Sequence, residues 1–131
     1  MKKRSYLFAV LLSVSGLAFS QSIEDELKEF AEEKYPNDYS MQEYVYEKQV
    51  AAYEYMQSVS DEEVKEIAVS EYPNDYSMQK YVYEKQLDAK KYMESVKDPE
   101  VKEIAISQYP NDYSMQKYVY ERQLKSKQRM E

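Results

Sequence analysis

The sequence YPNDYSMQEYVYEKQ, at residues 35–49, occurs again as YPNDYSMQKYVYEKQ at residues 72–86 and as YPNDYSMQKYVYERQ at residues 109–123. The three strings start 37 residues apart and are identical at 13 of their 15 positions. Only charged positions vary between them. A fixed period of about 20 to 50 residues is typical of repeat architectures, in which each unit buries its apolar face against the next.

Each period predicts two helices joined by a tight turn, as the middle one illustrates. A capping box that opens at Ser60 starts a short helix. Pro73 ends that helix, because the residue before a proline is pushed out of the α region. Asp75 or Ser77 then caps a longer helix that runs to about Val96.

We therefore expect an all-α fold of three tandem 37-residue helix-turn-helix repeats, which form a short α-solenoid or a helical bundle. The units lie at about 22–59, 60–97 and 98–131, and are called the first, second and third copies below. The period is near that of tetratricopeptide repeats. Their Trp and Gly signature positions are missing, so that similarity is one of architecture only.

The segment PNDYSMQ-x-Y inside each string also resembles a short helical segment of the form P-x-D-Y-x-M-Q. That segment recurs in uncharacterised bacterial and phage proteins. The resemblance covers residues 35–49, 72–86 and 109–123, about a third of the chain. It implies no activity and no site residues.

The first twenty residues have the features of a signal peptide. Residues 2–4 are basic, residues 6–14 are apolar, and residues 18–20 (AFS) form a small-x-small cleavage site. The apolar run is shorter than the roughly 20 residues of a spanning helix, which disfavours the alternative of an uncleaved anchor. We expect an exported bacterial protein, periplasmic or secreted, with no stable membrane anchor after cleavage and a helical repeat domain at 21–131.

Composition excludes several classes of function. The chain has no Cys, His or Trp, and its single glycine lies in the predicted signal. Metal sites built from His and Cys, Ser-His or Cys-His nucleophile pairs and glycine-rich phosphate loops are therefore excluded. The mature chain carries 15 basic and 25 acidic residues, a net charge of −10, which argues against nucleic-acid partners. We predict no catalytic residue, no metal site and no cofactor.

The long helix of the second copy presents two apolar stripes at 100° per residue. The main stripe consists of Met78, Tyr81, Val82, Ala89, Tyr92, Met93 and Val96. Tyr76, Tyr83 and Leu87 lie opposite. We expect the main-stripe tyrosines, Tyr44, Tyr81 and Tyr118, to fill the core.

The opposite stripe supplies the candidate partner-binding residues, because tyrosine combines a large apolar area with a hydroxyl group. They are Tyr39, Tyr46, Tyr76, Tyr83, Tyr113 and Tyr120. Two interpretations stay open for them. They form a periodic aromatic ladder that contacts a protein or a glycan, or they pack between repeats.

The leading functional hypothesis is an exported, non-enzymatic interaction module that binds another protein through a repeated tyrosine-rich helical surface. The alternative is a cell-envelope protein that binds glycan or peptidoglycan, since aromatic faces with Asn, Asp and Gln also suit sugars. A small enzyme or metal carrier is less favoured. The Asn-Asp turns offer too few oxygens for Ca²⁺, and the methionines form no close cluster for Cu(I).

Overall fold

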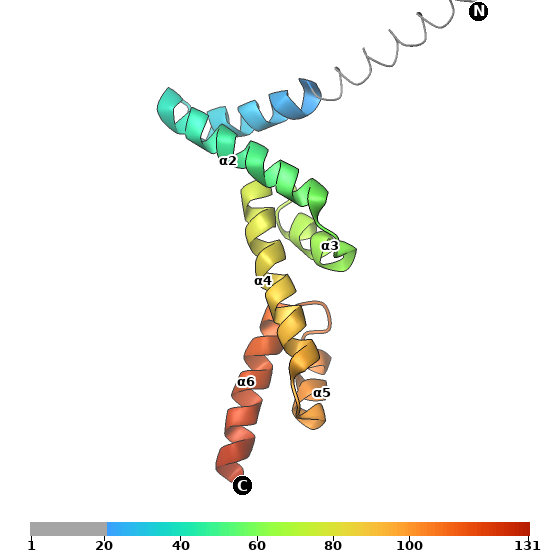
Figure 1. Ribbon diagram of the computed structural model, residues 1–131. Coiled ribbons are helices and arrows are strands. Elements are labelled where there is room, and N and C mark those ends of the chain that lie inside the picture. The colour runs from blue at the N-terminus through green and yellow to red at the C-terminus, as the bar shows by residue number, and fades with distance from the viewer. Residues whose placement is uncertain (1–20) are drawn as a thin grey trace, which may run out of the picture. The chain divides into compact units, whose positions relative to one another are not determined.

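The computed structural model describes residues 21–131, so the predicted signal peptide at 1–20 lies outside the described residues (Figure 1). The described chain is all-α and contains no strand. A helix covers residues 21–34. It is followed by α2 (Tyr39–Ser58), α3 (Glu62–Glu71), α4 (Tyr76–Ser95), α5 (Pro99–Gln108) and α6 (Tyr113–Met130).

The chain divides into two compact parts at residues 51 and 52, within α2. In the first part, Leu27, Ala31 and Val45 are buried. The second part contains the last turns of α2 and the helices α3 to α6. In it, α3 packs on α4, α4 on α6 and α5 on α6 (Figure 1).

Aspartates begin the helices of the second part. The N-caps of α3, α4, α5 and α6 are Asp61, Asp75, Asp98 and Asp112. Each carboxylate accepts the backbone N–H three residues ahead, at 3.0–3.2 Å. The predicted cap at Ser60 is wrong by one residue. A carboxylate at the next position both caps α3 and places negative charge at the positive end of the helix.

In each copy, a half-buried or buried glutamine of the long helix forms a hydrogen bond to the turn that precedes the helix. The side-chain N–H of Gln79 donates to the carbonyl of Tyr72 at 2.7 Å, and Gln116 makes the same bond to Tyr109. Gln42 does so in the first copy. The short helices end before Pro73 and its equivalent, as the sequence predicts, and no residue among 21–131 has a positive φ.

The core of the second part consists of two clusters that correspond residue for residue. The first cluster contains Met56, Val64, Ala68, Val82 and Tyr83. The second contains Met93, Val101, Ala105, Val119 and Tyr120, and each of these lies 37 residues after its counterpart. Small residues on the short helices, Ala68 and Ala105, allow close approach to the long helix, and neither is exposed at all.

The predicted core role of Tyr44, Tyr81 and Tyr118 is wrong, because these side chains are 50%, 57% and 55% exposed. The buried face of α4 consists of Gln79, Val82, Tyr83, Gln86, Ala89 and Met93. Neither predicted stripe included a glutamine, and the expected main stripe shares only Val82, Ala89 and Met93 with the buried face. Glutamine is tolerated inside because its amide is hydrogen-bonded.

Replacing Gln79 by alanine should therefore lower the free energy of unfolding by about 1–3 kcal/mol, because the Tyr72 carbonyl loses the shorter of its two hydrogen bonds and a buried side chain is removed. Gln57→Ala is the matched control, since Gln57 is exposed near the end of α2, and it should stay within about 0.5 kcal/mol. Urea unfolding followed by circular dichroism measures both. Equal stabilities of the two variants would contradict the role given to the buried amide.

Candidate functional site

The hydroxyl of a buried tyrosine joins each of the long helices α4 and α6 to the start of the short helix before it. The Tyr83 hydroxyl accepts the backbone N–H of Asp61 at 3.3 Å, and the Tyr120 hydroxyl accepts that of Asp98 at 3.2 Å. Both tyrosines are at most 4% exposed. Each ring also meets a tyrosine of the preceding long helix edge-on, with centroids 6.1–6.2 Å apart. These two candidate binding residues therefore hold the fold together.

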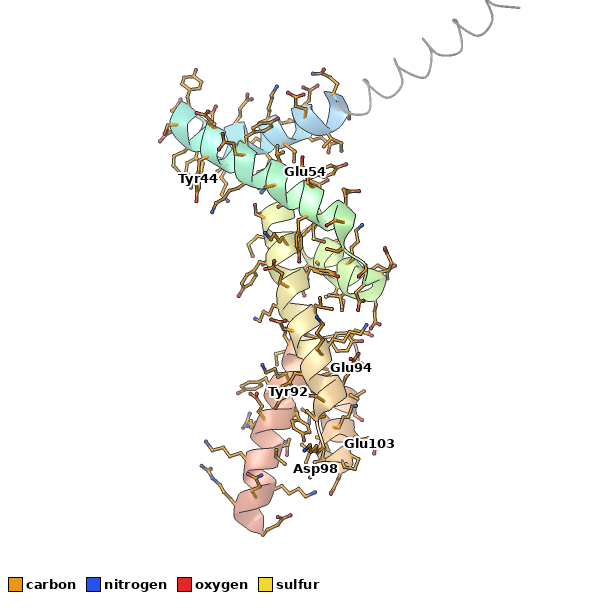
Figure 2. The ribbon with its side chains drawn as sticks, viewed as in Figure 1. Tyr44, Glu54, Tyr92, Glu94, Asp98 and Glu103 are labelled. Carbon is orange, nitrogen blue, oxygen red and sulfur yellow. The ribbon has the colours of Figure 1, made fainter. Side chains whose placement is uncertain are left out.

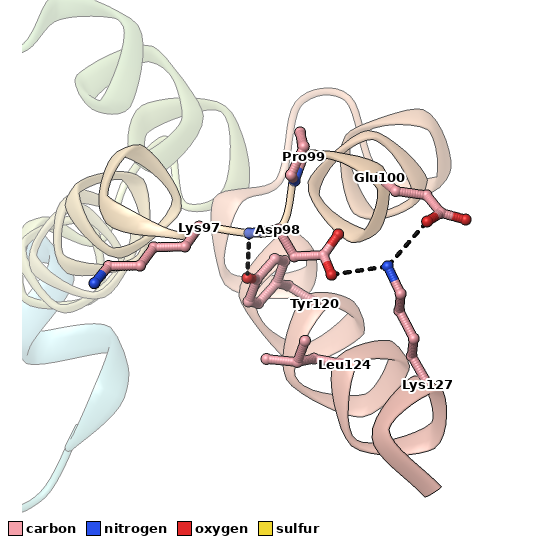
Figure 3. Close-up of a pocket in the computed structure, with 7 residues that line it drawn as sticks. All are labelled: Lys97, Asp98, Pro99, Glu100, Tyr120, Leu124 and Lys127. Carbon is pink, nitrogen blue, oxygen red and sulfur yellow. Dashed lines mark hydrogen bonds and ion pairs between the residues drawn. The ribbon is translucent and has the colours of Figure 1, made fainter. Parts of the chain in front are cut away.

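A lysine from the same long helix forms two ion pairs with acidic side chains at the start of the short helix. Lys127 lies 2.9 Å from both Asp98 and Glu100 (Figure 3). Lys90 lies 2.8 Å from Asp61 and 3.4 Å from Glu63. A surface pocket lies around the later cluster and is lined by Lys97, Asp98, Pro99, Glu100, Tyr120, Leu124 and Lys127 (Figure 3).

The pKa values of both lysines and of their aspartate partners are shifted away from neutrality. Hydrogen bonds to Glu100 and Asp98 raise the pKa of Lys127, and a hydrogen bond to Asp61 raises the pKa of Lys90. The pKa of Asp98 is lowered by the backbone N–H of Val101 and then by Lys127. A general acid or base needs a pKa near the working pH, so these shifts are in the wrong direction for proton transfer.

The described residues also bear on two other kinds of site. Among residues 21–131 there is no group of three Asp or Glu side chains placed to hold a metal ion. In the same range, no helix combines the length and the apolar character that crossing a bilayer requires.

The turn of the third copy docks on the second copy. The amide of Gln86 donates to the carboxylate of Asp112 at 2.9 Å and accepts the backbone N–H of Ser114 at 3.2 Å. Tyr113, which lies between Asp112 and Ser114 in the sequence, packs against the first core cluster. Its hydroxyl donates to Glu63. Burial and this carboxylate raise the pKa of Tyr113 to about 12.

The same docking position is used one copy earlier. The ring of Tyr76, which is 37 residues before Tyr113, meets the ring of Tyr53 edge-on at 5.1 Å. Tyr53 corresponds in the next copy to Lys90, whose ammonium lies 5.6 Å from the centre of the Tyr113 ring. The side chain that receives the docking tyrosine thus changes from tyrosine to lysine, and the contact persists.

The six candidate tyrosines therefore do not form one exposed ladder. Tyr83 and Tyr120 are buried, while Tyr46, Tyr76 and Tyr113 are half-buried. Only Tyr39 is prominently exposed, at 85%.

The tyrosines that are exposed at one position in all three copies are instead Tyr44, Tyr81 and Tyr118, the set that the sequence assigned to the core. Figure 2 labels Tyr44 on α2. Two of the three carry a lysine over the ring: Lys48 lies 4.7 Å from the centre of the Tyr44 ring, and Lys85 lies 6.0 Å from that of Tyr81. The signal that could have found them is the invariance of the two glutamines, which mark the buried side of each long helix.

Tyr83→Phe removes a hydroxyl that accepts a buried backbone N–H, so we expect the free energy of unfolding to fall by about 1 kcal/mol. Tyr81→Phe is the control on the same helix, and its loss should stay within about 0.5 kcal/mol, since Tyr81 is exposed. Thermal or urea unfolding distinguishes the two. A larger loss in Tyr81→Phe than in Tyr83→Phe would reverse the assignment of buried and exposed faces.

The charged cluster at Asp98 predicts a loss of stability in acid. The folded pKa of Asp98 lies below its ordinary value of 3.8, so the unfolded chain binds a proton first and stability falls as the pH drops below about 4. Asp98→Asn keeps a good N-cap but removes this charge. The variant should be less stable than the parent at pH 7, and the difference should disappear near pH 2. A difference that persists unchanged at pH 2 would exclude ionisation of Asp98 as its cause.

Comparisons of the chain with models of protein families, with curated proteins and with solved structures found no match. The resemblance of the repeated segment therefore stays a prediction, and the functional conclusion depends on the geometry described above.

Proposed function

We propose that the protein is an exported, non-enzymatic module that binds another protein through Tyr44, Tyr81 and Tyr118. The observation that carries the proposal is the exposure of these three side chains, which occupy one position in the repeated string. Tyr46, Tyr83 and Tyr120 lie only two residues further on and are half-buried or buried. In each copy, the repeated string thus contains one exposed tyrosine and, two residues later, one that is half-buried or buried.

Tyrosine suits this role physically. It supplies a large contact area with only two rotatable side-chain bonds, so that ordering it costs little, and it is common among the residues that dominate binding energy. Lys48 and Lys85 hold their ammonium groups near two of the rings. Such contacts restrict the motion of the rings before a partner arrives.

We also infer that the three copies are three structural repeats of one helix-turn-helix unit. The two core clusters, the two Tyr–Asp hydrogen bonds and the two Lys–Asp ion pairs, each recurring at an interval of 37 residues, support this inference. Repetition favours repeated binding to an extended or multivalent partner, because linked weak sites raise the overall affinity.

The net negative charge of the chain limits which charge the partner's contact surface can carry. The protein carries 25 acidic and 18 basic residues, so a strongly acidic partner would be repelled. A neutral or basic contact surface on the partner is expected. In the pocket of Figure 3, the pKa of Asp98 is lowered and that of Lys127 is raised, both away from neutrality, which supports a non-enzymatic role.

Export is the other element of the proposal, and it is supported by the basic, apolar and small-residue segments of residues 1–20. The intact mass of the protein from its native host should correspond to a chain that starts at Gln21.

The partner surface is tested by the triple change Tyr44→Ser, Tyr81→Ser and Tyr118→Ser. The melting temperature should change little, because exposed substitutions usually cost less than about 0.5 kcal/mol each. Capture of a protein partner from the native envelope fraction should be lost, since central interface tyrosines are worth about 2 kcal/mol or more.

The matched control is Val69→Ser with Ile106→Ser, which removes exposed apolar side chains at equivalent places on α3 and α5. This variant should capture the partner as the parent does. A triple variant with undiminished capture would overturn the proposed surface. Binding of the parent to purified peptidoglycan, lost in the triple variant, would replace the protein partner by a glycan.

A further inference from the structure

The contact between the second and third copies has two complementary sides. We call one side the socket: Glu63, Ile67, Gln86, Leu87 and Lys90. The other side, the plug, is the turn Asp112-Tyr113-Ser114. Gln86 holds both ends of the plug, while the ring of Tyr113 packs with Ile67 and Leu87 on the core and lies beside the Lys90 ammonium. The Tyr113 hydroxyl reaches Glu63.

The third copy contains a second socket, 37 residues further on. Its members are Glu100, Ile104, Gln123, Leu124 and Lys127. Lys127 pairs with Glu100 as Lys90 pairs with Glu63, so the charged part is already assembled. Within residues 21–131, however, no tyrosine packs on the second core cluster in the way that Tyr113 packs on the first. In the same part of the chain, the Gln123 amide makes no hydrogen bond, and Ile104 is exposed.

The first copy contains a matching plug, Asp38-Tyr39-Ser40. Its backbone is held as in the docked turn, because Asp38 accepts the N–H of Met41 at 3.0 Å and Asp112 accepts that of Met115 at 3.1 Å. Tyr39 is 85% exposed, whereas the docked Tyr113 is half-buried. The plug is therefore formed and accessible.

We propose that the plug of one chain docks in the second socket of another chain, so that the protein associates head to tail with copies of itself. Tyr39 of one chain lies beside Lys127 of the next and donates its hydroxyl hydrogen to Glu100. The Gln123 amide bridges the Asp38 carboxylate and the Ser40 N–H. Because the two sides differ, the contact is heterologous, and it generates open chains or closed rings.

Charge supports this occupant over others. Residues 21–40, which include the plug, contain seven acidic and two basic side chains. The helix that carries the second socket, α6, contains five basic side chains and one acidic side chain. Opposite charges on the two ends steer them together, and salt weakens the attraction. This inference uses the contact between the second and third copies and does not depend on the tyrosine surface of the proposed function.

The test is sedimentation analysis of the chain of residues 21–131 over a concentration series up to about 1 mM, where a millimolar Kd gives substantial association. The average mass of the parent should rise with concentration, and less so in high salt. Tyr39→Ala should weaken association at least about tenfold, because it removes the buried anchor of the contact. Gln123→Glu should do the same, because it loses an N–H donor and faces Asp38 with a like charge.

Mixing the two variants gives the decisive measurement. Tyr39→Ala keeps an intact socket and Gln123→Glu keeps an intact plug, so their mixture should form one-to-one dimers and nothing larger. Val69→Ala, which removes an exposed apolar side chain outside the plug and both sockets, should associate as the parent does.

Four results would overturn the proposal. They are a parent that stays monomeric throughout the series, a Tyr39→Ala chain that associates as the parent does, a mixture of variants that forms no dimer, and a Val69→Ala chain weakened to the same extent as Tyr39→Ala. Circular dichroism of each variant confirms that the fold is retained; Tyr39 and Gln123 both lie outside the buried cores, so that loss of folding in either would also contradict the inference.

Discussion

The aspartate at the start of each short helix in the second part is the residue on which the rest of that part depends. Asp98 caps α5 with its carboxylate, pairs with Lys127 through the same group, and gives its backbone N–H to Tyr120. Asp98 thus joins the start of α5 to two side chains of α6, Lys127 and Tyr120. Asp61 repeats every one of these contacts. Without them, a ten-residue helix such as α5 would have little reason to form, because isolated helices of that length are marginal in water.

Much of the fold could be predicted from the sequence, because its signals are local. Proline ends the short helices, and aspartate or an adjacent residue starts the next, so all-α structure and most helix boundaries follow from capping and turn chemistry. The candidate site could not be predicted in the same way. Whether Tyr81 or Tyr83 faces inward depends on which side of the helix is buried, and hydropathy assigns the buried glutamines to the wrong side.

The division of labour between neighbouring tyrosines follows from the helical period. Two residues apart on an α-helix means a rotation of about 200°, so Tyr118 and Tyr120 must face nearly opposite sides. One side meets the short helix and needs a hydroxyl to accept the Asp98 N–H, which phenylalanine could not supply. The other side meets solvent. A single string thereby specifies both a structural contact and a presented aromatic side chain.

The residue-for-residue match of the two cores has a consequence for how the chain finds its fold. The face of α6 that packs on α5 is nearly the same as the face of α4 that packs on α3, so local chemistry hardly distinguishes correct pairing of α3 from pairing with the helix one period later. What distinguishes them is loop length: four residues separate α3 from α4, and 41 separate it from α6. Loop closure favours the shorter connection by only roughly 2 kcal/mol for a tenfold difference in length. The stiffness of the glycine-free turn, with its proline and its bonded glutamine, therefore sets the fidelity of folding, and repetition of sequence makes register exchange between copies the characteristic folding error of this chain.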